Sequence, residues 1–558
     1  MKAAFFERKI VGLGIVALFA LFTGMAGLWT LPPLDRDEAR FAQATAQMLE
    51  TGDFIAIRFQ EDERNKKPAG IHWMQAASVA AFSNVDAREI WAYRLPSLLG
   101  GVLAAIFTFL AGTKLYDART GMLAGLLLAS APVVAAESTI AKTDGMLLAL
   151  ICLAQLAFVH VYASVEEKQK TGWGWPIIFW AAQGAGALVK GPIAPMISLL
   201  TGAGLLLSKG YAGWISRLRP IAGGILFILM TLPWLIAIGI ATDGRFFTDA
   251  IGGDMLGKVG DAQEGHSGPP GYHTLLLWFL FWPAAALIVP GIVQAWRERS
   301  EWQARFLLSW VIPAWIVFEI AATKLPHYTS PLYPALAILA AHAAVSLSQK
   351  PGWIGRAGTL AFIAIGFCAA GLVAALPMQF STGPMEPASM AIAALIAIAS
   401  ILIGILFWHG RAYQGGVAAA CLASLFAWIV MTGVLPGLSQ LAVSPRLSTA
   451  LEIAERHPIH DGAAPVAIAG YNEPSAVFLL GTRTALTSPE DAASRLLSGD
   501  ASAAVIEAHH KQAFEEALRG AGARSLAVID GLNYSNGDYV SLTIFTMAAQ
   551  PDQDADNR

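Results

Sequence analysis

Thirteen long apolar stretches divide most of this chain, and they constrain its fold more than any other feature of the sequence. Each has about the length, roughly 17 to 25 residues, that an α-helix needs to cross a bilayer. Hydrophobic residues make up 55% of the chain and charged residues only 14%, where a soluble domain usually carries about 25% charge. The sequence therefore excludes a soluble enzyme and predicts a polytopic α-helical membrane protein. The stretches lie near residues 10–31, 91–111, 121–138, 145–163, 173–189, 192–208, 221–241, 273–294, 306–322, 330–348, 357–376, 388–408 and 415–435.

Basic residues between the stretches predict the orientation. If the N-terminus is cytoplasmic, the inner connections hold sixteen Lys and Arg residues and the short outer connections hold five. Cytoplasmic connections normally carry such an excess. The first stretch lacks a convincing small-residue cleavage site, so we interpret it as a retained anchor and not a signal peptide. Thirteen crossings then place the C-terminus outside.

The first outer loop, residues 32–90, is long and carries charges of both signs. Within it, Ala39, Ala42, Ala46 and Leu49 recur at helical spacing. This pattern predicts an amphipathic helix that lies along the membrane surface.

The hydrophobic pattern of the sequence changes after residue 437. Short apolar runs such as PVAIAG and YVSLTIFTM alternate with helical runs such as PEDAASRLLSG, which predicts a small α/β domain. Asn536-Gly537 is a favourable turn for a β-hairpin. We therefore expect a transmembrane domain over 1–437, an outer α/β domain over 438–550 and a disordered tail over 551–558.

Charged residues gather at the outer ends of the predicted spans, where an ionisable group is costly unless it is used. Asp37 and Glu38 follow the first span, and Asp144 sits between two closely spaced spans. Each acid has a simpler interpretation as a helix cap. Lys67, Lys258 and Lys324 occupy outer connections, where a lysine often only reaches toward lipid headgroups.

Carboxylates and cations on one face match the needs of a lipid-phosphate sugar donor. The cations would neutralise the phosphate of the leaving group, and an acid would orient or deprotonate the acceptor. A transporter would place its charges at mid-membrane on broken helices. The net charge of −3 gives no reason to expect nucleic-acid binding.

An ordered set of motifs resembles one known family. The set resembles the bacterial aminoarabinose-type lipid A transferases, within the protein O-mannosyltransferase-like superfamily of C-type glycosyltransferases. The motifs are DRDEARFAQATAQMLETGDFI, NKKPAGIHWMQA, YRLPSLL, AKTDGMLLAL, ALVKGP, GHSGPPGYH and TKLPHYTSPLYPALA.

The resemblance implies a C-type glycosyltransferase fold and roles for individual residues. Asp37, Glu38 and Asp144 would be the catalytic acids, with Asp37 the principal one. Lys67, Lys258, Lys324 and Tyr328 would contact the donor phosphate. Further loop candidates are Arg40, His266 and His327.

Two positions depart from the family pattern. Lys66 stands where those enzymes carry Glu before the lysine, and Lys258 is the nearest candidate for an Arg of the large outer loop. Lys keeps the charge but loses bidentate geometry. Without that Glu, a metal site with His266 lacks its acid, so we expect no metal and no other cofactor.

The sequence therefore predicts an inverting glycosyltransferase of the bacterial inner membrane. It would move a sugar from undecaprenyl phosphate to lipid A or another lipopolysaccharide acceptor at the periplasmic face, in contact with membrane lipids and as a monomer. A protein or another envelope glycan as acceptor is the alternative within this class, and a flippase or transporter of lipid-linked sugars is the alternative outside it. The sequence does not name the sugar.

Overall fold

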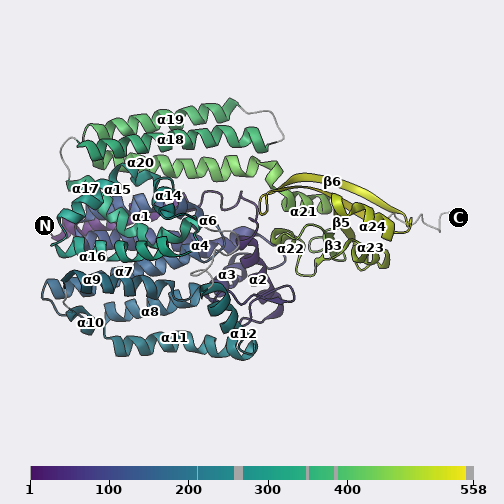
Figure 1. Cartoon of the computed structure of the whole chain (residues 1–558), viewed down its shortest axis with the longest axis horizontal. Helices are drawn as coiled ribbons and strands as arrows, with labels where there is room; N and C mark the ends of the chain where they lie inside the picture. The colour runs from purple at the N-terminus through teal and green to yellow at the C-terminus, as the bar shows by residue number, and fades with distance from the viewer. Residues whose placement is uncertain (1, 210–211, 257–267, 347–350, 382–386, 548–558) are drawn as a thin grey trace.

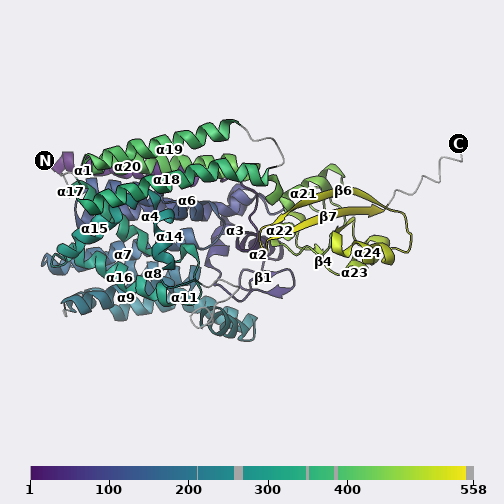
Figure 2. The same cartoon turned by 45° about the horizontal axis from the view of Figure 1, so that its top comes forward.

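The computed structural model describes residues 2–209, 212–256, 268–346, 351–381 and 387–547. A bundle of long helices holds the N-terminus at one end of the elongated molecule, and a small mixed α/β domain forms the other end (Figure 1). Helices α2 (Asp37–Thr51) and α3 (Gly70–Phe82) lie between these two parts in both views (Figures 1 and 2). The architecture predicted from the sequence is confirmed.

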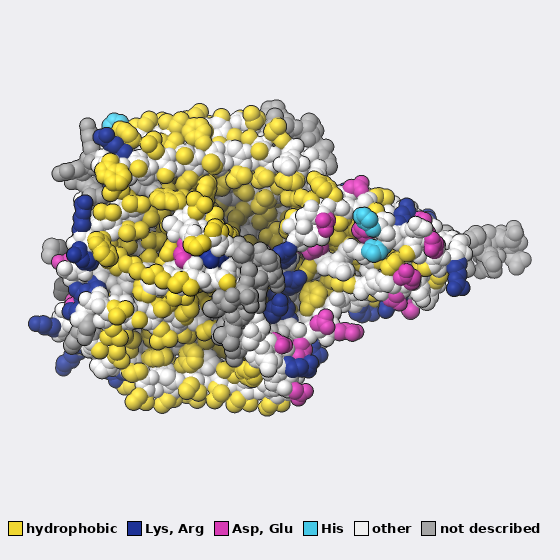
Figure 3. Space-filling view, viewed as in Figure 1, with side chains coloured by type: hydrophobic (Ala, Val, Ile, Leu, Met, Phe, Trp, Pro, Cys, Tyr) yellow, Lys and Arg dark blue, Asp and Glu magenta, His cyan; other side chains and the backbone are white. Residues whose placement is uncertain are grey.

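The bundle is apolar on its outside. Its visible face is covered by hydrophobic side chains, whereas acidic and basic residues gather at its ends and on the α/β domain (Figure 3). Large side chains such as Ile221, Ile240 and Leu395 are 65% to 83% exposed, as expected of helices that face lipid. The bundle helices are α1 (Lys2–Gly24), α4 (Ile90–Leu115), α5 (Ala118–Ala129), α6 (Pro132–Thr139), α7 (Asp144–Glu166), α8 (Gly174–Lys190), α9 (Ile193–Lys209), α11 (Pro220–Ala241), α14 (Tyr272–Leu280), α15 (Ala285–Arg297), α16 (Trp302–Ile320), α17 (Tyr333–Ser346), α18 (Trp353–Phe380), α19 (Pro387–Trp408) and α20 (Ala412–Trp428).

Every predicted apolar stretch falls on one of these helices or on a bent pair of them. In the described part of the chain, seven helices are long and apolar enough to cross a membrane, and nine spans result if each bent pair counts as one. The remaining stretches coincide with the shorter helices α1, α8, α9 and α17. The number of thirteen crossings stays a prediction.

Prolines mark both bends. Helices α5 and α6 meet at 63°, and α6 begins with Pro132. Proline lacks an N–H and is well suited to the first helical position, where that N–H has no partner. The pair α14 and α15 meets at 89° across a short segment that contains Pro283. The first bend directs α6 toward the loop before α7, which becomes part of the site below.

The outer loop folds as predicted into a helix, but that helix packs differently. Ala42 and Ala46 of α2 are fully buried and cluster with Tyr93 of α4 and Phe478 of the α/β domain. The apolar face of α2 thus packs on protein and not on lipid, because another domain covers it. Between α2 and α3 the short strands β1 (Arg58–Phe59) and β2 (Asp62–Glu63) pair antiparallel.

The α/β domain contains a five-stranded sheet with the order β4-β3-β5-β7-β6. Strands β4, β3 and β5 are parallel, and the β6–β7 hairpin adds antiparallel strands at one edge. The predicted runs of this domain are confirmed as strands and helices. Its elements are α21 (Val443–Ile453), β3 (Val466–Ala469), α22 (Pro474–Leu480), β4 (Ala485–Leu486), α23 (Pro489–Ser498), β5 (Ala503–Glu507), α24 (Lys511–Ala517), β6 (Ala523–Asn533) and β7 (Asp538–Met547).

The predicted hairpin turn at Asn536-Gly537 is confirmed within a four-residue turn over 534–537. Gly537 has φ +88° and donates its N–H to the Asn533 carbonyl at 2.8 Å. A backbone with positive φ favours glycine, which explains the residue at this position. The predicted tail over 551–558 lies outside the described residues, and the domain boundary at 437 stays a prediction.

Short segments connect the larger elements. They are α10 (Gly213–Arg217), α12 (Arg245–Phe247), the π-helical segments η1 (Thr248–Leu256) and η5 (Ile429–Val434), and the 3₁₀ segments η3 (Trp282–Ala284), η4 (Pro326–Leu332), η6 (Leu435–Gly437), η7 (Ser439–Leu441) and η8 (Ala508–His510). Of these, η4 carries residues of the candidate site.

Candidate active site

Two cavities adjoin where the outer loop meets the bundle. One has a volume of about 660 Å³ and a mainly apolar lining, and the other has a volume of about 570 Å³ and a mixed, charged lining. Their shared wall is formed by Lys66, Lys67, Asp144, Lys190, Thr323, His327 and Tyr328. An apolar space and a charged space therefore meet at a row of lysines.

The apolar cavity lies among membrane helices. Leu188 of α8, Met196 of α9, Trp234 of α11 and Phe318 of α16 line it. Side chains of this kind offer dispersion contacts and no hydrogen-bonding groups apart from the indole N–H. The cavity therefore suits a hydrocarbon chain.

Asp37 faces the charged cavity from the first position of α2. The unpaired N–H groups of a helix N-terminus favour a carboxylate there. The Asp37 side chain is 60% exposed, and Arg64 Nη2 lies 3.9 Å from its Oδ1. The Arg64 guanidinium in turn lies over the Phe41 ring at 4.5 Å. Asp37 is thus a carboxylate held in place through its backbone, with its oxygens toward the cavity.

Glu38 has the opposite surroundings. Its carboxylate is 1% exposed and accepts bonds from Arg94 Nε and Nη2, both at 2.8 Å. The backbone N–H groups of Leu34 and Ala141 donate to the same carboxylate at 2.8 and 2.7 Å. The Glu38 carboxylate thus accepts four hydrogen bonds from the protein itself. This pattern identifies Glu38 as a residue that positions other groups.

Asp144 lies at the first position of α7, beside the last residue of α8. Lys190 Nζ contacts Asp144 Oδ1 at 2.6 Å, and Lys142 Nζ lies 3.9 Å from Oδ2. Lys190 ends α8 next to Gly191, which has φ +63°. A cation at a helix C-terminus and an anion at a helix N-terminus are both stabilised by the helix dipoles. Asp144 therefore anchors the ammonium group of Lys190 at the shared wall.

Glu137 and His327 complete this cluster. Lys142 Nζ lies 2.9 Å from Glu137 Oε1, and the His327 ring nitrogens lie 3.8 Å from Glu137 and 3.7 Å from Asp144. Burial alone would lower the pKa of Lys142, but the two carboxylates hold that pKa above its ordinary value. Burial holds the pKa of His327 well below its ordinary value although Asp144 opposes the shift. The two carboxylates therefore favour the charged form of Lys142, and burial favours the neutral form of His327.

Most predicted site residues meet in these cavities. Asp37, Glu38, Arg40, Lys67, Asp144, His327 and Tyr328 all line the charged cavity. Lys324 does not line either cavity, because its Nζ donates to the Ala321 carbonyl at 2.7 Å. Lys258 and His266 lie outside the described residues.

Sequence reasoning missed three groups as site residues: Glu137, Lys190 and Arg64. Glu137 has a visible signal, because a carboxylate within the apolar run PVVAAEST has to find a polar partner. Lys190 and Arg64 resemble ordinary connection residues in the sequence, and only the fold brings them to the cavity.

One group of possible metal ligands occurs in the described part of the α/β domain. It comprises Glu452, His457 and His460. His457 Nδ1 already accepts bonds from the N–H groups of Ile459 and His460, and Nε2 bonds the Ser448 hydroxyl. Both ring nitrogens of His457 have partners, so this group is not a convincing metal site.

Known glycosyltransferases are similar to this chain in sequence. A profile of the family described as dolichyl-phosphate-mannose-protein mannosyltransferase matches residues 66–236. A Pseudomonas aeruginosa relative, named undecaprenyl phosphate-alpha-4-amino-4-deoxy-L-arabinose arabinosyl transferase, is 26% identical over 82% of this chain and 84% of its own length. A Yersinia pestis protein of the same name is 26% identical over 58% of each chain.

Solved structures resemble the whole chain. The crystal structure of ArnT from Cupriavidus metallidurans bound to undecaprenyl phosphate matches with a TM-score of 0.73 at 20% identity, covering 97% of this chain and 99% of that one. This chain has the fold of the C-type glycosyltransferases. The apo oligosaccharyltransferase of Archaeoglobus fulgidus shares the fold of this glycosyltransferase more distantly, with a TM-score of 0.52 at 13% identity over 96% of this chain and 74% of that one. The apolar helices and the relatives make this glycosyltransferase a multi-pass protein of the inner membrane.

Replacement by alanine should affect the stability of the protein very differently at the neighbouring acids Asp37 and Glu38. We expect Glu38→Ala to destabilise the glycosyltransferase by about 3–5 kcal/mol, because it leaves the buried Arg94 charge without its partner. Asp37→Ala is the matched control and should unfold close to the wild-type temperature, because that side chain is largely exposed. Thermal unfolding of the purified protein in detergent measures both. Wild-type stability of Glu38→Ala would contradict the assignment of Glu38 as a positioning group.

Proposed function

We propose that this glycosyltransferase moves a sugar from undecaprenyl phosphate to lipid A or another lipopolysaccharide acceptor. The observation that carries the proposal is the shared wall, where Lys67, Lys190 and Tyr328 separate an apolar cavity from a charged one. A polyprenyl-phosphate sugar has the same order of parts: a hydrocarbon chain, a phosphate and a polar sugar. The chain would occupy the apolar cavity, the phosphate would lie at the lysines, and the sugar would enter the charged cavity.

The relatives support this donor. The Pseudomonas aeruginosa relative is named for an undecaprenyl-phosphate-linked aminoarabinose, and the ArnT structure was determined with undecaprenyl phosphate bound. The lipid A acceptor rests on the resemblance of the sequence motifs to lipid A transferases. The charged cavity, lined by Asp37, Arg40, Asp62 and Arg64 among others, offers both signs of charge to a polar acceptor.

The cations of the wall act on the leaving group. As the acceptor oxygen forms a bond to the anomeric carbon, the bond from that carbon to the phosphate oxygen breaks, and the phosphate keeps the electron pair. Lys67 and Lys190 stabilise the charge that develops on the phosphate, in a partly dry site where fixed charges act strongly. A charge-assisted contact of this kind contributes about 1.5–3 kcal/mol.

Asp37 acts on the other side of the anomeric carbon. Attack opposite to the phosphate inverts that carbon, so the acceptor has to approach from the charged cavity. A phosphate acceptor is already ionised at pH 7, and Asp37 then orients it and stabilises positive charge on the sugar. A hydroxyl acceptor has to lose its proton, and Asp37 is then the general base.

The other two predicted acids have supporting roles in this proposal. Asp144 holds Lys190 at the phosphate position, and Glu38 holds the segment before Asp37. No step uses a metal or another cofactor, since Lys66 and not an acid precedes Lys67. A single chain supplies every group named, so we propose that a monomer is active.

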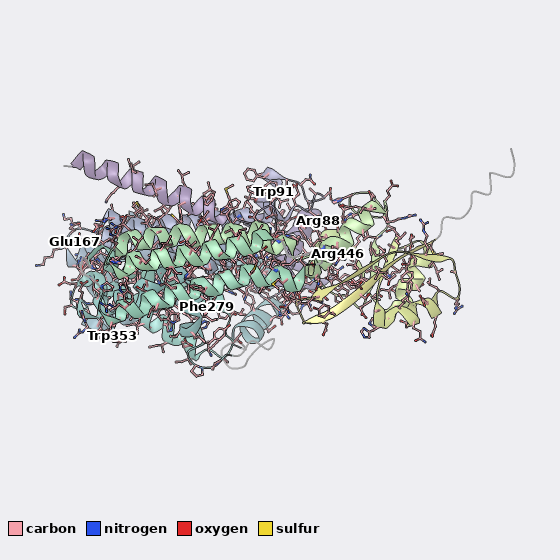
Figure 4. All side chains as sticks on the ribbon, turned by 90° about the horizontal axis from the view of Figure 1, so that it is seen from above. Arg88, Trp91, Glu167, Phe279, Trp353 and Arg446 are labelled. Carbon is pink, nitrogen blue, oxygen red and sulfur yellow. The ribbon has the colours of Figure 1, made fainter. Side chains whose placement is uncertain are left out.

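The charge distribution supports a periplasmic site. Glu167 and Trp353 lie at the end of the bundle away from the α/β domain, whereas Arg88 and Arg446 lie next to that domain (Figure 4). Lys168 and Lys170 lie in the connection that follows Glu167, and Arg356 lies in the first turn of α18, close to Trp353. Basic connections favour the cytoplasm. We therefore propose that the N-terminus is cytoplasmic and that the site and the α/β domain are periplasmic.

The first experiment compares lipid A and core oligosaccharide by mass spectrometry. Cells with the wild-type gene should show one sugar mass that is absent both from a deletion strain and from a strain carrying Asp37→Asn. The variant keeps the size of the side chain and should accumulate in the membrane to the wild-type level, as a blot verifies. The mass difference identifies the sugar, and its position identifies the acceptor.

Other outcomes have distinct meanings. A full sugar signal with Asp37→Asn would contradict the catalytic assignment. A lipopolysaccharide unchanged by the deletion, with a sugar missing from envelope proteins or another glycan, would indicate the other acceptor class. Undecaprenyl-phosphate sugar accumulating on the cytoplasmic side after deletion would indicate a flippase.

Lys190→Gln should weaken binding of undecaprenyl phosphate by roughly 10- to 100-fold, because a phosphate contact and the Asp144 partner are both lost. Lys209→Gln is the matched control: Lys209 also ends a helix and pairs with a carboxylate, Glu166, at 2.7 Å, but does not line either cavity. Binding is measured with purified protein in nanodiscs. Equal affinity of the two variants would contradict the phosphate position.

A further inference from the structure

The segment in front of Asp37 has an unfavourable backbone. Arg36 precedes α2 with φ 63° and ψ −110°, and its side chain does not cap the helix. A non-glycine residue in such a conformation costs free energy and persists only where surrounding contacts enforce it. The direction in which α2 starts, and therefore the place of Asp37, depends on those contacts.

One set of contacts comes from the membrane domain. The Leu34 N–H donates to Glu38 Oε2 at 2.8 Å, and Arg94 holds that carboxylate from α4. These bonds fix the segment on one side of Arg36 and the first turn of α2 on the other. They leave Asp35 and Arg36 themselves to be held from elsewhere.

The second set comes from the tip of the β6–β7 hairpin, nearly 500 residues later in the chain. The Asp35 N–H donates to the Tyr534 hydroxyl at 2.7 Å, and the Arg36 guanidinium donates to the Ser535 carbonyl. Burial at this contact raises the pKa of the Asp35 carboxyl to about 6. In Figure 1 the hairpin extends from the sheet to the side of the α/β domain that faces the bundle.

The hairpin tip is itself braced. The Glu473 carboxylate accepts from Asn533 Nδ2 at 2.7 Å and from Ser535 Oγ at 2.9 Å. Asn533 Oδ1 accepts the Ser535 N–H at 3.0 Å. A turn with this many internal bonds presents Tyr534 in one position.

Helix α22 connects this brace to the membrane domain. Glu473 immediately precedes α22, and Phe478 within α22 packs edge-to-face on Tyr93 with ring centroids 5.3 Å apart. The Arg88 guanidinium lies over the same Phe478 ring at 5.7 Å. The position of the hairpin tip is thus fixed relative to α4 through Glu473 and α22. Helix α4 also carries Arg94.

We propose that Tyr534, together with the Ser535 carbonyl, is a positioning element of the active site: the hairpin tip holds Asp35 and Arg36 in the conformation that aims Asp37 at the reacting sugar. The inference rests on the proposed function, because it takes Asp37 as the catalytic acid. It assigns the α/β domain a part in turnover without any contact to donor or acceptor. It also gives the Glu473 carboxylate a role, because Glu473 holds Asn533 and Ser535 on either side of Tyr534.

Tyr534→Phe tests the proposal, because it removes the hydroxyl that receives the Asp35 N–H and keeps the ring. We expect kcat to fall roughly tenfold, the size of one lost hydrogen bond, with KM for the donor and the unfolding temperature unchanged. Tyr539→Phe is the matched control, since Tyr539 belongs to the same hairpin but is 69% exposed. The assay uses the full chain in nanodiscs with the donor that the mass comparison identifies.

Arg36 provides a second, independent variant. Arg36→Ala should lower kcat in the same way, and Arg36→Lys should restore part of the activity because an ammonium group can also donate to the Ser535 carbonyl. Donor affinity of all variants, measured with undecaprenyl phosphate alone, should equal that of the wild type.

The possible failures are distinguishable. If Asp37→Asn is inactive but Tyr534→Phe and Arg36→Ala keep the wild-type kcat, the positioning proposal is wrong and the proposed function stands. If both variants lose stability or donor affinity in place of kcat, the hairpin is a structural contact only, and the proposal is again wrong. If Asp37→Asn is fully active, the proposed function fails first.

Discussion

The buried ion pair between Glu38 and Arg94 determines the arrangement of the site. Arg94 binds the Glu38 carboxylate in bidentate fashion and also donates to the backbone carbonyls of Leu31 and Pro32 at 2.8 and 2.9 Å. Glu38 receives the Ala141 N–H from the loop before α7. Because either charge alone would be costly in this place, the pair joins the end of the first span, α2, α4 and that loop as one unit. The positions of Asp37 and Asp144 relative to each other are consequently fixed, although the two residues are distant in the chain.

The lysines of the site lie at the boundary between an apolar and a charged environment. Lys190 ends a membrane helix and Lys67 precedes α3, so both ammonium groups reach the level where apolar lining gives way to charged lining. A phosphate attached to a hydrocarbon chain has its energetic minimum at such a boundary, since the chain is excluded from water and the phosphate from hydrocarbon. The carboxylates of Asp144 and Glu137 keep Lys190 and Lys142 in place when no anion is bound.

The α/β domain is attached to the site through polar contacts and one aromatic anchor. Phe478 inserts between Tyr93 and Arg88, while Gln43 and Gln60 bond Thr482 at its side chain and backbone. These contacts cover the apolar face of α2, which explains why that face is not available to lipid. They also bring the β6–β7 hairpin to the segment before Asp37.

Local pattern determined much of this protein by itself: the apolar stretches became helices, and the alternating runs after residue 437 became strands and helices. These features depend on hydrophobic periodicity and on residue type, both of which are present in a single sequence. The resemblance of the motifs to a known family indicated Asp37, Lys67, Asp144 and Tyr328 as site residues, and these four side chains line one cavity. Only the tertiary structure decided which acid of the Asp37-Glu38 pair faces the cavity, which surface covers α2, and that Glu137, Arg94 and Tyr534 belong to the site's surroundings. Those outcomes depend on burial and on partners far away in the chain, because the same side chain is a cap, an ion-pair partner or a catalytic group according to what packs against it.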